Sequence, residues 1–286
     1  MEDFSDFVPD VSFEQIPIKN LVSNQEYQRN LSLRHIQRTV SNFDLNQVNP
    51  VKVSRRNGLN YVINGQHTIE IIRAVSNSQE TPVWCMVYDD LSYPVEADIF
   101  ANQQKYTKPL SSYEIFMANI EAGSDDQLTI ISLVESYGLR LASGRVLNGI
   151  CAISCLEQIY SKSGYHTLDR TLRLIVSTWE GDPLSLSASI IRGVSMIVDI
   201  YGECIKDDVF CERLGTMSAI EIIRNGKSRR PGIIGYAEAM IIVYNKNHKR
   251  NLPLWKLDGR TRHGGPLSES QKVNSGGSDN ASLKLP

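Results

Sequence analysis

The chain has 286 residues, of which 41% are hydrophobic, and this length allows a substantial buried core in two domains. No apolar run is long enough to span a membrane, and residues 1–15 are acidic and interrupted by Pro9, which argues against a membrane protein and a signal peptide. Five scattered cysteines without a Cys-x-x-Cys pair argue against a zinc site and indicate reduced thiols in a cytoplasmic protein.

The N-terminal part has the pattern of a small mixed-sheet α+β domain, which we expect at residues 13–110 after a flexible N-terminus at residues 1–12. Short or alternating apolar runs predict strands at residues 15–18, 51–53, 59–63 and 81–88, with a hairpin turn between the second and the third. The spacing of apolar residues predicts helices at residues 33–43, 68–76 and 92–101.

The turn after the third predicted strand is the most informative element of this part. The strand ends at Asn64-Gly65, and a helix follows at once with Gln66, His67 and Thr68. The first N–H groups of a helix lack intrahelical partners and the helix dipole is positive there, so this turn can hold an anion. His67 is expected to be neutral here, and could donate to a phosphate or act as a general base. In the alternative, the motif is a plain turn and His67 contacts a neighbouring loop.

From Ser111 onward the sequence shows only helical patterns, which predicts an all-helical domain at residues 111–256. The predicted helices cover residues 112–121, 125–137, 143–160, 167–179, 187–201, 206–217, 219–225 and 233–247. The stretch 257–286 is rich in Gly, Ser and Asn, and we expect it to be a disordered tail.

The charge is unevenly distributed along the chain. The whole sequence has 30 basic and 32 acidic side chains, but residues 224–262 contain ten basic and two acidic ones. We therefore expect the C-terminal part to contact a polyanion such as DNA. The candidate phosphate contacts are Lys227, Arg229, Arg230, Lys246, Lys249 and Arg250. A solvated basic surface is the alternative.

Four motifs between residues 13 and 115 occur in an order typical of one superfamily. They are Tyr27-Gln28-Arg29, the segment from Asn46 to Val53, Asn64-Gly65-Gln66-His67, and Asn102-Gln103-Gln104-Lys105 followed by Pro109. In this order the chain resembles the N-terminal domain of the ParB/sulfiredoxin superfamily. The Gly-Gln-His form is similar to the motif of phage and mobile-element relatives.

The resemblance implies a ParB/sulfiredoxin-like fold with a nucleotide- or phosphate-binding pocket, for which CTP or ATP with Mg are the candidate ligands. The pocket residues that it implies are Arg29, Asn64, Gly65, Gln66, His67, Thr68, Asn102, Gln104 and Lys105. ParB proteins have Glu and arginines after the Gly, so Gln66, His67 and Thr68 would hold a phosphate differently. Gln66 also stands where sulfiredoxins have their catalytic Cys, so sulfiredoxin activity is not expected.

The resemblance also predicts a helix-turn-helix at residues 125–156. Its second helix would begin at Ser143 and present Arg145 and Asn148 to the major groove of DNA. A core helix is the alternative, because residues 143–160 are strongly apolar.

Three functions stay open at this point. The first is a ParB-like DNA-binding protein of a phage, plasmid or integrative element. The second is a nuclease or nucleotide hydrolase at the same pocket with His67 as its catalytic residue, although the nearest carboxylates, Glu26 and Glu70, form no clear pair for a metal ion. The third is a non-catalytic protein that forms a homodimer through its apolar helices.

Overall fold

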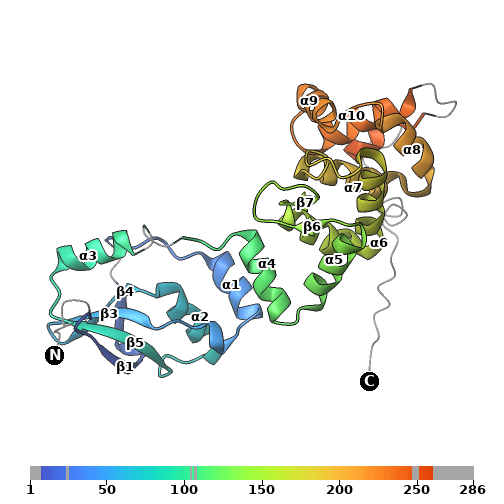
Figure 1. Ribbon diagram of the computed structural model, residues 1–286. Coiled ribbons are helices and arrows are strands. Elements are labelled where there is room, and N and C mark those ends of the chain that lie inside the picture. The colour runs from blue at the N-terminus through green and yellow to red at the C-terminus, as the bar shows by residue number, and fades with distance from the viewer. Residues whose placement is uncertain (1–7, 24–25, 104, 106–107, 247–250, 260–286) are drawn as a thin grey trace, which may run out of the picture. The chain divides into compact units, whose positions relative to one another are not determined.

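A computed structural model describes residues 8–23, 26–103, 105, 108–246 and 251–259 of the chain (Figure 1). The chain forms two compact units, Met1–Pro109 and Leu110–Pro286. The first contains a five-stranded mixed sheet with helices, and the second is mainly helical, so the predicted α+β class is confirmed. None of the helices within these described ranges is long and apolar enough to cross a bilayer.

The sheet of the first unit has the strand order β1-β5-β3-β4-β2. Its strands are β1 (Ser12–Pro17), β2 (Leu21–Ser23), β3 (Val51–Arg56), β4 (Leu59–Asn64) and β5 (Pro82–Asp89). The β1–β5 and β3–β4 pairs are antiparallel, whereas β3–β5 and β2–β4 are parallel. The predicted hairpin between β3 and β4 is confirmed, and it turns at Asn57 and Gly58, whose φ angles of 54° and 74° suit a two-residue hairpin loop.

The helices of this unit differ in how far they are buried. They are η2 (Ile18–Asn20), α1 (Leu33–Ser41), η3 (Leu45–Gln47), α2 (Gln66–Ser76) and α3 (Tyr93–Asn102). Val53, Val62 and Cys85 of the sheet are buried together with Ile69 of α2. Helix α1 packs beside α2 without burying any residue.

The second unit is built around α6, α7 and α10 (Figure 1). Its α-helices are α4 (Ser112–Glu121), α5 (Asp125–Ser136), α6 (Ile153–Trp179), α7 (Ala188–Tyr201), α8 (Asp207–Leu214), α9 (Ala219–Arg229) and α10 (Ile233–Asn245). Its core includes the fully buried Leu172, Ile191, Phe210 and Met240. Gly164, with φ 78° and ψ 179°, interrupts α6 between the two helices that the sequence predicts there.

The helix predicted at residues 143–160 begins only at Ile153, so the prediction is wrong for its first ten residues. Between α5 and α6 the chain instead forms a short parallel pair, β6 (Arg140–Leu141) and β7 (Gly149–Ile150). Asn148 has a left-handed φ of 54°. A Cβ on Gly149 would lie 2.4 Å from the Val146 side chain, so this close turn requires glycine. The structure therefore contradicts the helix-turn-helix expected at residues 125–156, and the second unit, which is otherwise helical as expected, contains this one short strand pair in its described part.

The ordered chain continues past the expected start of the C-terminal tail. Two short 3-10 helices, η4 (Gly202–Cys204) and η5 (Leu254–Asp258), complete the described part of the second unit. Leu257 in η5 is buried in the core, which explains why the chain stays folded here. The rest of the expected tail, residues 260–286, and the N-terminal residues 1–7 lie outside the described residues.

Candidate functional site

Gly65 forms the turn from β4 into α2, and two independent features require a glycine there. Its φ of 109° is a conformation that side chains disfavour. A Cβ on this residue would also lie 3.0 to 3.2 Å from Val51 on the neighbouring strand. Helix α2 therefore begins tight against the sheet.

The N-terminus of α2 has no side-chain cap. The carbonyl of Gly65 accepts the first helical hydrogen bond from the N–H of Ile69 (3.0 Å), so the N–H groups of Gln66, His67 and Thr68 belong to the uncapped first turn. These groups and the positive end of the helix dipole create a favourable place for an anion.

A cavity of about 140 Å³ opens at this helix terminus. The structure brings six of the predicted pocket residues to it, namely Arg29, Asn64, Gly65, Gln66, His67 and Thr68. Three further lining residues, Gln28, Ile63 and Phe100, were not predicted. Gln28 could have been found from its place beside Arg29 in the same motif, whereas no sequence signal marks Phe100.

Gln28 and Tyr27 fix the loop that carries Arg29. The Gln28 side-chain amide donates to the carbonyl of Val62 in β4, and its buried Oε1 has no hydrogen-bond partner in the described part of the chain. The Tyr27 ring packs between Tyr93 and Phe100 of α3, with centroid distances of 5.6 and 5.5 Å. Arg29 is thus held at the cavity by its neighbours.

A partly buried ion pair anchors α3 to the sheet. The Arg56 guanidinium donates from Nε to Oε1 of Glu96 (2.7 Å), and Glu96 is fully buried. Arg56 also lies 3.9 Å from the centroid of the Tyr61 ring. Burial, with a smaller contribution from the Glu96 charge, raises the pKa of Tyr27 to about 12, so the Tyr27 hydroxyl stays protonated.

His67 contacts the neighbouring loop. Its Nε2 accepts a hydrogen bond from the backbone N–H of Ser32 (3.0 Å), and its ring packs edge-on against His35 at a centroid distance of 5.5 Å. Burial lowers the pKa of His67, and electrostatic repulsion from the nearby Arg29 and His35 side chains lowers it further. His67 is therefore neutral with its proton on Nδ1, and its Nε2 is already used in a structural contact.

The remaining predicted pocket residues lie elsewhere or outside the described residues. The Asn102 side chain donates to the Asp98 carboxylate on its own helix (2.7 Å) and does not line the cavity. Lys105 is exposed and does not line it either. Gln104 lies outside the described residues.

The carboxylates near the cavity have partners. Glu70 forms an ion pair with Arg73 (2.7 Å), and Glu26 accepts a hydrogen bond from the Tyr93 hydroxyl (2.5 Å). Within the described ranges, no three His, Cys, Asp or Glu side chains are grouped so that they could hold a metal ion. The chemistry that this arrangement supports directly is the binding of an anion.

The structure separates the basic residues predicted to contact DNA. Lys227 and Arg229 are exposed in the last turn of α9, and Lys246 follows the far end of α10. Helix α10 has 13 residues and is about 20 Å long, so it separates Lys246 at its far end from Lys227 and Arg229, which lie near its start. Arg230 is half-buried and forms ion pairs with Glu238 (2.6 Å) and Asp258 (2.7 Å).

The other residues predicted to contact DNA do not lie on a recognition helix in the described part of the chain. Arg145 is exposed in the loop between β6 and β7, not on a helix. The backbone carbonyl of Asn148 accepts a hydrogen bond from the N–H of Arg140 (2.9 Å) in the β6–β7 pair. Lys249 and Arg250 lie outside the described residues.

The fold and the site define a protein with an α+β unit, a helical unit and a candidate anion cavity at a helix N-terminus. The chain belongs to the family of unknown function DUF6551, whose profile matches residues 22–256. No curated protein matches the chain.

One solved structure with a similar chain is the crystal structure of the C-terminally truncated chromosome-partitioning protein ParB from Caulobacter crescentus, complexed with CTP-gamma-S. The two chains are 13% identical, and the match covers 82% of this chain and 98% of that chain with a TM-score of 0.34. Because they superpose poorly, this likeness carries no information about the ligand of the present chain.

Proposed function

We propose that the first unit binds a phosphate-bearing ligand, a nucleotide such as CTP or ATP, at the Gly65 cavity. The observation that carries this proposal is the uncapped N-terminus of α2, which opens into a cavity that also contains Arg29. Backbone N–H groups at a helix terminus and an arginine side chain are both strong partners for phosphate oxygens. The neutral side chains of Gln66 and Thr68 can add hydrogen bonds without repelling an anion.

The size of the cavity limits how the ligand can enter. At about 140 Å³ it is much smaller than the roughly 300–1,000 Å³ of pockets that enclose a whole small molecule. The phosphate groups would therefore enter and the nucleoside would stay outside. We propose binding and not hydrolysis, because Nε2 of His67 accepts from Ser32 and both Glu26 and Glu70 are already engaged.

Replacing Arg29 with alanine should weaken the binding of inorganic triphosphate by about tenfold or more, because the cavity loses its charged phosphate contact. Isothermal titration calorimetry at low salt, with triphosphate, CTP and ATP, would measure this. The matched control is Arg38→Ala, which removes the same charge from α1 outside the cavity. Equal losses in both variants, or no anion binding by the natural protein, would contradict the proposal.

We also propose that the chain acts on DNA, as a ParB-like protein of a phage, plasmid or integrative element. The four ordered motifs support the ParB-like part, and the exposed basic end of α9 supports DNA contact through Lys227 and Arg229. Such contacts would give affinity without sequence choice.

Replacing both Lys227 and Arg229 with alanine should weaken DNA binding and lower its salt dependence. The slope of log affinity against log salt should fall by about 1 for each DNA phosphate that the variant no longer neutralises. Mobility-shift or fluorescence anisotropy titrations at several salt concentrations would show this. The control is the double variant Arg34→Ala, Arg38→Ala, which removes two exposed charges from α1. An unchanged slope in the α9 variant would exclude this surface.

A further inference from the structure

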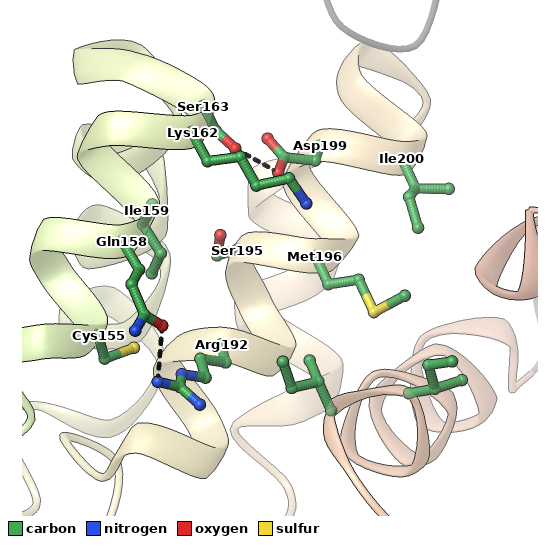
Figure 2. A pocket seen from close by; sticks show the side chains of 12 residues that line it. Cys155, Gln158, Ile159, Lys162, Ser163, Arg192, Ser195, Met196, Asp199 and Ile200 are labelled. Atoms are coloured by element: carbon green, nitrogen blue, oxygen red, sulfur yellow. Dashed lines mark hydrogen bonds between the residues drawn. The ribbon is translucent and has the colours of Figure 1, made fainter. Parts of the chain in front are cut away.

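A second cavity, of about 410 Å³, lies inside the helical unit between α6, α7 and the start of α10 (Figure 2). This volume lies in the range of pockets that enclose small molecules, roughly 300–1,000 Å³. Its apolar walls are formed by Ile159, Met196, Ile200, Ile233 and Ile234. No part of the proposed nucleotide or DNA binding uses this cavity, which belongs to the second unit alone.

Two basic side chains reach the cavity without an acidic partner. Arg192 of α7 donates to the side-chain oxygen of Gln158 (2.8 Å), and the other N–H groups of its guanidinium can serve a further acceptor. Lys162 of α6 also lines the cavity and is exposed. Within the described part of the chain, neither Arg192 nor Lys162 takes part in an ion pair. Figure 2 shows Lys162 beside Asp199 in the upper part of the cluster of lining side chains, and Arg192 beside Gln158 in the lower part.

The one acidic residue that lines the cavity, Asp199, already has uncharged hydrogen-bond partners. Asp199 accepts hydrogen bonds from the hydroxyls of Ser163 (2.7 Å) and Thr167 (3.0 Å), one on each carboxylate oxygen. Two cations and one anion give the cavity a net charge of +1. Burial raises the pKa of the Cys155 thiol, so this residue is a neutral part of the wall and not a nucleophile.

We propose that this cavity binds a small amphipathic organic anion. Its carboxylate would lie on Arg192, and its hydrocarbon body would cover Ile159, Met196 and the start of α10. The planar guanidinium matches a carboxylate, with which it can form two parallel hydrogen bonds. A purely apolar ligand would desolvate Arg192 without pairing it.

Three ligands of equal chain length test this assignment: octanoate, octanol and octylammonium. Calorimetric titration of the full chain should show that octanoate binds at least about tenfold more tightly than octanol, and that octylammonium binds most weakly. In Arg192→Gln the affinity for octanoate should fall to that for octanol, while octanol binding should not weaken. Arg145→Gln removes an exposed arginine from the same unit outside the cavity, and it should retain the preference.

A second variant keeps the test decisive if Arg192→Gln does not fold. Met196→Trp should fill the cavity and weaken the binding of octanoate and octanol alike, and circular dichroism would confirm that its helices are intact. Equal affinity for octanoate and octanol, or no binding of either, would overturn the proposal. An octanoate affinity that falls as the protein concentration rises would also overturn it, because a second copy of the chain would then cover the cavity.

Discussion

Replacing Arg56 with methionine should raise the unfolded fraction of the first unit by about 100-fold at pH 7, because the fully buried Glu96 carboxylate would lose its charged partner. The second oxygen of Glu96 has no hydrogen-bond partner in the described part of the chain, so its charge depends on Arg56. The loss can be measured as reduced protection of β3 and β4 amides from hydrogen exchange.

Two further variants show whether burial is the cause. Lys19→Met breaks an ion pair of equal length, 2.7 Å to Glu80, but both of its side chains are exposed, so little stability should be lost. The double variant Arg56→Met, Glu96→Leu removes both charges and should recover much of the stability. A loss in Lys19→Met as large as that in Arg56→Met would contradict this explanation.

Replacing Gly65 with alanine should destabilise the first unit by about 1–3 kcal/mol and abolish anion binding. The φ of 109° is unfavourable for alanine, and its Cβ would meet Val51 at 3.0 to 3.2 Å. Relief of this contact would tilt α2 away from the sheet and move its first N–H groups out of the cavity. Urea unfolding and calorimetric titration with triphosphate would measure the two effects.

The matched control for Gly65 is Gly58→Ala in the β3–β4 hairpin. Gly58 also has a positive φ, 74°, but a Cβ there would have no atom within 4 Å, and Gly58 does not line the cavity. This variant should lose some stability and keep its affinity for triphosphate. The double variant Gly65→Ala, Val51→Ala removes the two closest contacts, with the Val51 methyl groups at 3.0 and 3.1 Å, and leaves the Val51 Cα at 3.2 Å and the strained φ. Any stability that it regains therefore measures the part of the loss that comes from the methyl contacts. If Gly58→Ala lost anion binding as well, the role of the α2 terminus would be in doubt.

Strands, turns and helices that depend on residues close together in the sequence could be predicted. The strand, turn and helix around Gly65 depend on neighbouring residues, and the structure places them at Leu59–Asn64 and Gln66–Ser76. The segment before α6 could not be predicted in this way. Val146 and Leu147 have helical spacing with their apolar neighbours, yet both are exposed in the loop that joins β6 to β7. The parallel pairing of these strands is not visible in a local pattern.

In the candidate site, too, some residues could be predicted from the sequence and others depend on tertiary packing. The order of the motifs was sufficient to group Arg29 with Gly65 and His67 at one cavity. Phe100 could not be found, because its position at the cavity depends on tertiary packing, in which its ring contacts that of Tyr27. The ion pairs of Arg230 could not be predicted from the sequence either, because they join the residue after α9 to α10 and η5.

The interruption of α6 at Gly164 is bridged by a side chain from another helix. Ser163 precedes the interruption and Thr167 follows it, and both hydroxyls bind the same carboxylate, that of Asp199 in α7. The bend of α6 is therefore fixed by its neighbour as well as by its own glycine. In the evolution of this fold, a change at one acidic position of α7 could alter the direction of α6 without any change in the sequence of α6 itself.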